Sequence, residues 1–184
     1  VAGAPPGPCS GGAILGDHVR MMEHCQDPGV FVRSTATRGS LGGLSQSTHG
    51  IVHVMDAMGM DVVIVETVGV GQSEIEVAKL AHTKVLLLVP GMGDDIQVLK
   101  AGIMEICDVF VVNKADRRGA QEQVSEIKAM IDMGLERSRG WVPPVLKTVA
   151  TNGVGVAEVV DVLERHKRHW DSQWEENEAL RNEL

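Results

Sequence analysis

Short apolar runs that alternate with helix-like segments restrict most strongly how this chain can fold. Apolar residues dominate four runs, which we predict to be strands, at residues 61–65, 84–89, 109–112 and 145–149. Helical spacing or capping residues predict helices over 44–58, 73–82, 94–105, 119–135 and 156–170. Strands without a polar face that alternate with helices favour a mostly parallel sheet covered on both sides. We therefore predict a three-layer α/β fold.

The remaining segments give weaker indications of structure. Residues 1–12 are rich in Gly, Pro and Ala and are expected to be irregular, residues 30–33 to form a short strand, and residues 34–43 a flexible loop. The tail from 170 to 184 is polar and helix-prone. In parallel sheets functional groups gather at the carboxyl ends of the strands, so those ends are examined first.

Composition excludes several classes of protein. The 184 residues suit one domain, and a net charge of -8 argues against binding to a nucleic-acid backbone. With 3% aromatic residues, stacking surfaces for single strands are also missing. Three well-separated cysteines indicate a reduced, cytoplasmic protein, and the apolar runs are too short to span a membrane. The sequence begins with Val rather than Met, which indicates a fragment or a processed product.

The strongest motif is Asn113-Lys114-Ala115-Asp116, directly after the apolar run 109–112. N-K-x-D at the end of a strand is how GTP-binding proteins recognise guanine. The Asp116 carboxylate could accept hydrogen bonds from N1 and N2 of the base, whereas adenine would leave it unpaired at a cost of several kcal/mol. Asn113 would tie neighbouring loops together, and the Lys114 stem would cover one face of the base. A polar turn after a strand is the plain alternative.

A second motif follows the run 61–65 and contains Glu66, Gly69 and Gln72. A carboxylate at a strand tip could hold Mg²⁺, largely through water. The backbone N–H of Gly69 could approach a γ-phosphate, and Gln72 could orient an attacking water. An ordinary glycine-rich turn before a helix is the alternative.

Three weaker signals accompany these motifs. Val149, Ala150 and Thr151 follow the last predicted strand and could close a guanine pocket, with Val where such loops often carry Ser. Asp17 follows paired glycines and could approach a metal, although an N-capping Asp is equally compatible with the spacing. The loop 91–100, which ends at Lys100, could be a mobile switch or only the capped start of a helix.

The chain resembles the ArgK/MeaB GTPases, G-protein chaperones of adenosylcobalamin-dependent acyl-CoA mutases. The matching stretches are 10–17, 33–43, 61–74, 86–95, 102–116 and 143–155, among them the loop RSTATRGSLGG and the segment VETVGVGQSE. The resemblance implies a P-loop NTPase G domain over residues 1–168, incomplete at its N-terminus, and the start of a helical dimerisation arm over 169–184.

The same resemblance implies the roles of individual residues. Asp17 and Glu66 would belong to the Mg²⁺ and phosphate site, and Gly69 and Gln72 to a second switch. The first switch would include Arg38 and Gly39, and Lys100 would lie in a further switch that signals to the mutase. Asn113, Lys114, Asp116 and residues 149–151 would bind the base of GTP or GDP.

The chain departs from the family pattern in two features of the phosphate site. No G-x-x-x-x-G-K-[S/T] motif occurs in the 184 residues, and Ala4 stands where the family carries an Asp. The missing lysine and N–H cradle predict weak nucleotide binding and poor GTP hydrolysis by this chain.

Two other functions compete with a mutase chaperone. A metal-delivery GTPase for hydrogenase or urease would be expected to carry a His- or Cys-rich site, and none is visible in the sequence. A non-catalytic, nucleotide-poor binding module is the third possibility. The pairs His49/His53 and His166/His169 share helix faces, but we expect them to be solvated rather than metal ligands, and Cys107 to be part of the core.

Overall fold

The computed structural model describes residues 2–4, 27–36, 43–67, 80–91, 106–134 and 140–182, and within these ranges the side chains of 2–4, 34–36, 43–47, 134 and 174–182 are not described. The chain divides into two compact units, Val1–Ala81 and His82–Leu184. Each unit is described by itself.

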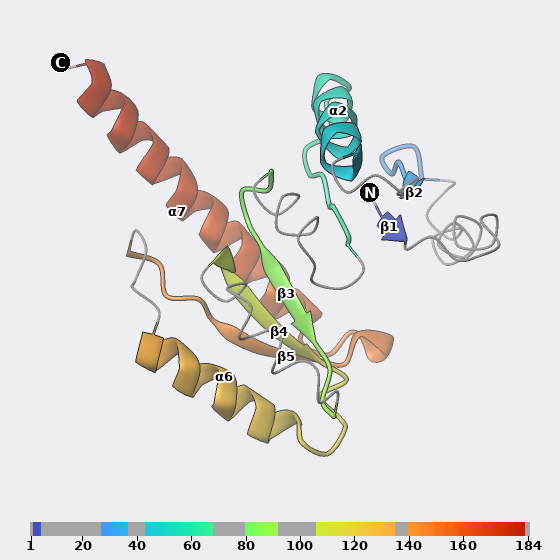
Figure 1. The fold of residues 1–184 in the computed structure, drawn as a ribbon, viewed down its shortest axis with the longest axis vertical. Helices are drawn as coiled ribbons and strands as arrows, with labels where there is room; N and C mark the ends of the chain where they lie inside the picture. Colours follow the sequence, from blue (N-terminus) through green and yellow to red (C-terminus); the bar gives the residue numbers. More distant parts are fainter. Residues whose placement is uncertain are drawn as a thin grey trace. The chain divides into compact units, whose positions relative to one another are not determined.

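A three-stranded parallel sheet forms the centre of the second unit (Figure 1). Its strands are β3 (Val85–Leu88), β4 (Val109–Asn113) and β5 (Val145–Thr148), with β4 in the middle. Helix α6 (Ala120–Gly134) connects β4 to β5, and α7 (Val156–Asn182) follows β5. The two helices cover opposite faces of the sheet (Figure 1). This confirms the α/β fold predicted from the alternating pattern.

The apolar character of β4 follows from burial on both of its faces. Val109 and Val111 form one cluster with Leu146 of β5 and Val162 of α7. Side chains alternate along a strand, so Phe110 of β4 points to the other face, where α6 contacts β4 and β5. Val109 and Phe110, which point to opposite faces of the sheet, are both completely buried. Burying five or six such side chains, at about 1.5–3 kcal/mol each, supplies much of the stability of this unit.

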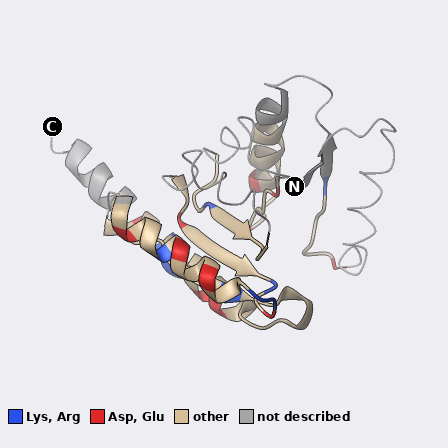
Figure 2. Ribbon diagram, turned by 60° about the horizontal axis from the view of Figure 1, so that its bottom comes forward, with Lys and Arg blue, Asp and Glu red and all other residues tan. Residues whose placement is uncertain are grey.

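Helices α6 and α7 contain both acidic and basic residues along their length (Figure 2). Exposed examples on α7 are Glu164, Arg165 and Lys167. This mixed charge is the pattern of helices with one apolar stripe and a solvated face.

In the first unit the structure differs from several sequence predictions. Strand β1 (Ala2–Ala4) pairs in parallel with β2 (Ser34–Ala36), so residues 2–4 are not irregular and residues 34–36 are not part of a loop. Residues 30–33, predicted to be a strand, are neither strand nor helix. Helix α2 (Gly43–Ala57) forms as predicted and ends before Gly59, whose φ of 80° suits glycine.

The strand predicted at 61–65 does not form. Residues 62–65 belong to no helix or strand, and Val62 and Ile64 are 76% and 75% exposed. A strand that is apolar on both faces is stable only between neighbouring strands and beneath helices. Apolar composition alone therefore does not produce a strand at residues 62–65.

Helix ends differ from prediction at two further places. The helix predicted over 156–170 continues to Asn182, through the point at which we divided domain from arm. Residues 80–82 are not helical, so the predicted end of the helix 73–82 at His82 is wrong. The rest of that helix and the helix predicted over 94–105 lie outside the described residues. In the described ranges, no helix combines the length and the apolar character required to cross a membrane.

Candidate functional site

Asn113 is the last residue of β4 and pairs in register with Thr148, the last residue of β5. Its Oδ1 atom accepts a hydrogen bond from the Thr148 hydroxyl at 3.1 Å and another from the backbone N–H of Ala150, also at 3.1 Å. Because a backbone N–H can only donate, the amide oxygen of Asn113 must face Ala150, and its Nδ2 group is directed elsewhere as a donor. Asn113 thus links the loops after β4 and β5, as the sequence analysis expected.

The turn after Asn113 is tight and locally strained. Lys114 has a φ of 56°, a left-handed conformation that costs a non-glycine residue on the order of 1 kcal/mol. This conformation turns the chain back toward β5, where the N–H of Ala115 donates to the Thr148 carbonyl at 3.0 Å. The N–H of Arg117 donates to the Lys114 carbonyl, also at 3.0 Å, and closes the turn. Strain of this kind is tolerated where the surrounding bonds determine the backbone, which is frequent at functional sites.

Asp116 lies at the tip of this turn. Its side chain is exposed, and no residue in the described ranges donates a hydrogen bond to its carboxylate. Lys114 is exposed as well. The turn therefore presents a carboxylate and a long aliphatic stem beside the amide of Asn113, which are the groups that the N-K-x-D motif would use.

The loop after β5 is closed on itself. Val149 donates its N–H to the Val154 carbonyl at 2.9 Å, and a short 3₁₀ helix, η4 (Ala150–Asn152), occupies the interval. Gly155 has a φ of 76°, and a Cβ atom at this position would overlap the carbonyl oxygen of Lys147. This close approach holds the start of α7 against β5 and leaves Ala150 and Thr151 exposed beside Asn113.

The structure modifies one expected contact. The sequence analysis expected residues 149–151 to face a base, but the backbone N–H of Ala150 already donates to Asn113. A base that used this donor would have to share it with Asn113 or displace Asn113 from it. Thr148 was missed by the sequence analysis, although a buried Thr at the end of the strand next to Asn113 is the signal that could have identified it.

Other predicted site residues cannot be placed beside these loops. Glu66 is exposed and belongs to the first unit. The other predicted residues lie outside the described ranges: Asp17, Arg38, Gly39, Gly69, Gln72 and Lys100. Within the described ranges, no three His, Cys, Asp or Glu residues are grouped as metal ligands.

Histidine and cysteine predictions have different outcomes. His49 and His53 are exposed on α2, as expected, with ring centroids 6.4 Å apart. His166 was also expected to be solvated, but this is wrong, because only 4% of it is exposed. Burial raises the pKa of Cys107 to about 12, with Asp108 adding to the rise and Lys84 opposing it. Cys107 is therefore a protonated core residue, as predicted.

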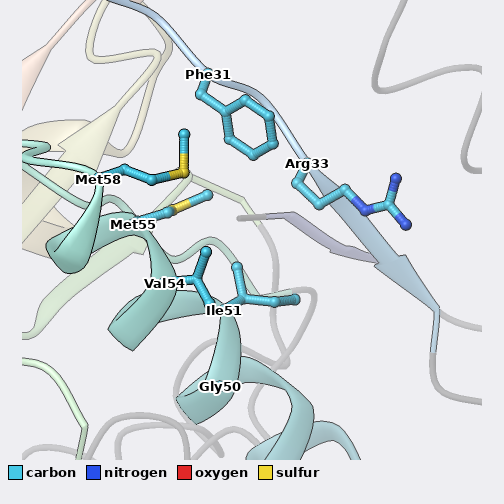
Figure 3. Close-up of a pocket in the computed structure, with 7 residues that line it drawn as sticks. All are labelled: Phe31, Arg33, Gly50, Ile51, Val54, Met55 and Met58. Atoms are coloured by element: carbon cyan, nitrogen blue, oxygen red, sulfur yellow. The ribbon is translucent and has the colours of Figure 1, made fainter.

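The first unit has an apolar pocket that the sequence analysis did not anticipate. The pocket is lined by Phe31, Arg33, Gly50, Ile51, Val54, Met55 and Met58. Figure 3 shows Phe31 facing the methionines, while the guanidinium of Arg33 is directed away from them. None of its lining residues was predicted to take part in a site.

A parallel α/β sheet that carries an N-K-x-D turn, with its Asn joined to the adjacent loop, is characteristic of GTP-binding proteins. The family model described as "Methylmalonyl Co-A mutase-associated GTPase MeaB" matches residues 1–183. The chain belongs to this MeaB family of GTPases.

Curated relatives come from archaea, bacteria and animals. The chain is 52% identical over 170 residues to a Pyrococcus horikoshii protein named as a GTPase, with 91% of this chain and 54% of that protein covered. It is 39% identical over 163 residues to GTPase ArgK of Escherichia coli, covering 86% and 49% of the two chains. It is 38% identical over 171 residues to the mouse "Methylmalonic aciduria type A homolog, mitochondrial", covering 89% and 40%. The chain thus spans about half the length of these relatives.

Proposed function

We propose that this chain contributes the guanine-reading half of a GTPase that acts on a cobalamin-dependent acyl-CoA mutase. The observation that carries the proposal is the double hydrogen bond from Thr148 and Ala150 to Asn113. It joins the loops after β4 and β5 into one surface and leaves the Asp116 carboxylate exposed beside them.

Asp116 would select the base. Its carboxylate would accept two hydrogen bonds from N1 and N2 of guanine, and Nδ2 of Asn113 would donate to an acceptor on the same base. Adenine would present no matching pair of donors, and the cost of an unpaired, desolvated carboxylate is several kcal/mol. The Lys114 stem would cover one face of the base, and residues 149–151 would close the pocket.

Phosphate and metal would be held by other residues. Glu66 and Asp17 would hold Mg²⁺ together with phosphate oxygens, since Mg²⁺ prefers few carboxylates and retains water. Gly69 would approach the γ-phosphate, and Gln72 would orient the attacking water. Because the 184 residues contain no G-x-x-x-x-G-K-[S/T], we expect this chain alone to bind GTP weakly and to hydrolyse it slowly.

The partner would be an adenosylcobalamin-dependent acyl-CoA mutase, whose cofactor loading the GTPase cycle would gate. The family description, which names methylmalonyl-CoA mutase, supports this class of partner. Arg38, Gly39 and Lys100 would change position with the nucleotide and report it to the mutase. Residues 169–184 would begin a dimerisation arm, and α7 is continuous across this boundary.

A direct test compares GDP and ADP binding to the wild-type chain and to Asp116→Asn. We expect a preference for GDP that the Asn variant loses, because its amide would place a donor against the donors of guanine. Asp132→Asn, which makes the same change at an exposed position on α6, serves as the matched control. Equal affinity of the wild-type chain for both nucleotides would show that the turn does not select guanine.

The partner is tested separately by capture of purified methylmalonyl-CoA mutase in the presence of GDP or of a GTP analogue. We expect retention that depends on the nucleotide and weakens in Lys100→Ala. Equal retention in all states would favour a passive binding module, and retention of a nickel enzyme instead would favour metal delivery.

A further inference from the structure

A buried polar cluster lies at the edge of the second unit's sheet opposite the candidate site, where β3 and β4 begin. His166 of α7 is the centre of this cluster. Its Nδ1 atom is 2.8 Å from the hydroxyl of Thr83, just before β3, and its Nε2 atom is 3.5 Å from Oδ1 of Asp108, just before β4. These contacts connect α7 to two strands at once.

Hydrogen-bond chemistry restricts where the protons of this cluster can lie. A carboxylate can only accept, so in a ring with a single proton that proton would lie on Nε2, facing Asp108. Nδ1 is then an acceptor, and the Thr83 hydroxyl donates to it. The other oxygen of Asp108, Oδ2, accepts from the backbone N–H of Lys84 at 2.8 Å and from its ammonium group at 3.1 Å.

Trp141 covers the cluster. Its indole N–H donates to the backbone carbonyl of Asp108 at 2.8 Å. Its ring meets the His166 ring edge-on at 4.7 Å and lies 5.5 Å from the ring of His169. Trp141 therefore links His166 to the segment before β5.

Among the side chains of α7 that the structure describes, the apolar contacts with β4 and β5 precede His166. Val159, Val162 and Leu163 pack against β4 and β5 in the first turns of the helix. Beyond His166, every described side chain up to Gln173 is exposed or half-buried, including Trp170, which meets His82 at 5.9 Å. Among the described side chains of α7, the last buried one is thus that of His166, which is held by polar contacts with Thr83 and Asp108 and by the ring of Trp141.

We propose that Thr83, Asp108 and His166 form a latch that holds α7 against the sheet. When this latch breaks, the part of α7 that follows His166 separates from the sheet while the sheet itself stays folded. The hydrogen bonds of the latch compete with water, so opening costs far less than exposing the apolar contacts of Val162. This proposal does not depend on nucleotide binding.

Hydrogen exchange of backbone amides tests the latch. In the wild-type chain we expect faster exchange in residues 167–182 than in 156–163. Thr83→Val removes the hydroxyl at nearly constant volume and should accelerate exchange in 167–173 about fivefold, the equivalent of one hydrogen bond of about 1 kcal/mol. Exchange in β4 and β5 should not change. Ser125→Ala, which removes an exposed hydroxyl on α6, should leave all segments unchanged.

Two results would overturn the latch. One is equal acceleration in β4 and in α7, which would mean that α7 opens only with the whole unit. The other is unchanged exchange in 167–173. Nitrogen NMR of the wild-type chain provides a measurement that needs no variant: the neutral His166 ring should carry its proton on Nε2, and a proton on Nδ1 would contradict the assigned bonds.

Discussion

Asn113→Ala should destabilise the second unit by an amount that the structure allows us to estimate. The change removes the acceptor for two donors, the Thr148 hydroxyl and the Ala150 N–H. Thr148 is 4% exposed, so its unpaired hydroxyl should cost about 1–2 kcal/mol. Ala150 is exposed, and water can replace its partner at a cost of roughly 0.5 kcal/mol. We expect a total near 2 kcal/mol, or a fall in Tm of about 9 °C for a unit of this size.

Urea denaturation followed by tryptophan fluorescence measures this change in the appropriate unit. All three tryptophans, Trp141, Trp170 and Trp174, belong to the second unit. Asn113→Asp is the matched variant, because a carboxylate oxygen can still accept both hydrogen bonds. It should keep most of the stability while losing the Nδ2 donor toward the base.

A double-mutant cycle with Thr148→Val completes the test. If the hydroxyl depends on Asn113, Thr148→Val should cost about 1 kcal/mol in the wild-type background but recover stability beside Asn113→Ala, because it then removes an unpaired buried hydroxyl. Additive effects, or equal losses in Asn113→Ala and Asn113→Asp, would refute the view that the side-chain oxygen joins the two loops.

Three further predictions concern other parts of the second unit. Gly155→Ala should lower stability by roughly 2 kcal/mol more than Gly153→Ala in urea titrations, because both glycines have a φ of 76° but only at 155 does a Cβ overlap the Lys147 carbonyl; equal losses would contradict this account. Burial raises the pKa of Asp108. The hydrogen bonds from His166 and Lys84 and the positive charge of Lys84 lower it by more, so the net pKa of Asp108 lies below its usual value. Its contribution to stability is therefore complete above about pH 5 and is lost as the pH falls through the folded-state pKa, so the stability difference from Asp108→Asn should shrink between about pH 5 and pH 3; a constant difference would refute the linkage. Cys107 should resist alkylation at pH 8 in the folded chain and react on unfolding in urea, whereas rapid labelling of the folded chain would show that the thiol is accessible.

The central elements of the second unit could be predicted from sequence because their residue patterns are stable in one arrangement, a buried strand covered by an amphipathic helix. The run 109–112 is apolar throughout and is buried on both faces of a sheet, and 120–134 has the amphipathic spacing of a covering helix. The position of Asn113 at the end of β4 follows directly from its place after the run. Local pattern and tertiary structure agree at these places.

Prediction failed where structure depends on distant partners. The run 61–65 has the composition of a buried strand, yet residues 62–65 belong to no strand, since composition cannot supply the neighbouring strands and helices that a buried strand needs. Residues 34–36 were assigned to a loop because Ser and Thr are common in turns, but pairing with residues 2–4 makes them a strand. The polar tail beyond 170 continues α7 to Asn182, because its residues have high helix propensity.

Side-chain contacts of the candidate site were only partly predictable. The spacing of N-K-x-D indicates which residues meet a base, but the partners of Asn113 depend on the register of β4 against β5. Thr148 and the Lys114 backbone conformation are consequences of that register and of the turn that follows it. His166 illustrates the same limit, since a histidine in a charged helix becomes buried only because Asp108 and Trp141 meet it from other segments.

An NMR titration of the labelled chain with guanosine and with adenosine tests the central claim most directly, because nucleosides do not require a phosphate-binding loop. We predict that guanosine shifts the backbone resonances of residues 113–116 and 149–152 at millimolar concentration, that adenosine does not, and that Asp116→Asn abolishes the guanosine effect. Equal shifts with both nucleosides, or shifts located away from these loops, would contradict the assignment of Asn113–Asp116 as a guanine-reading turn.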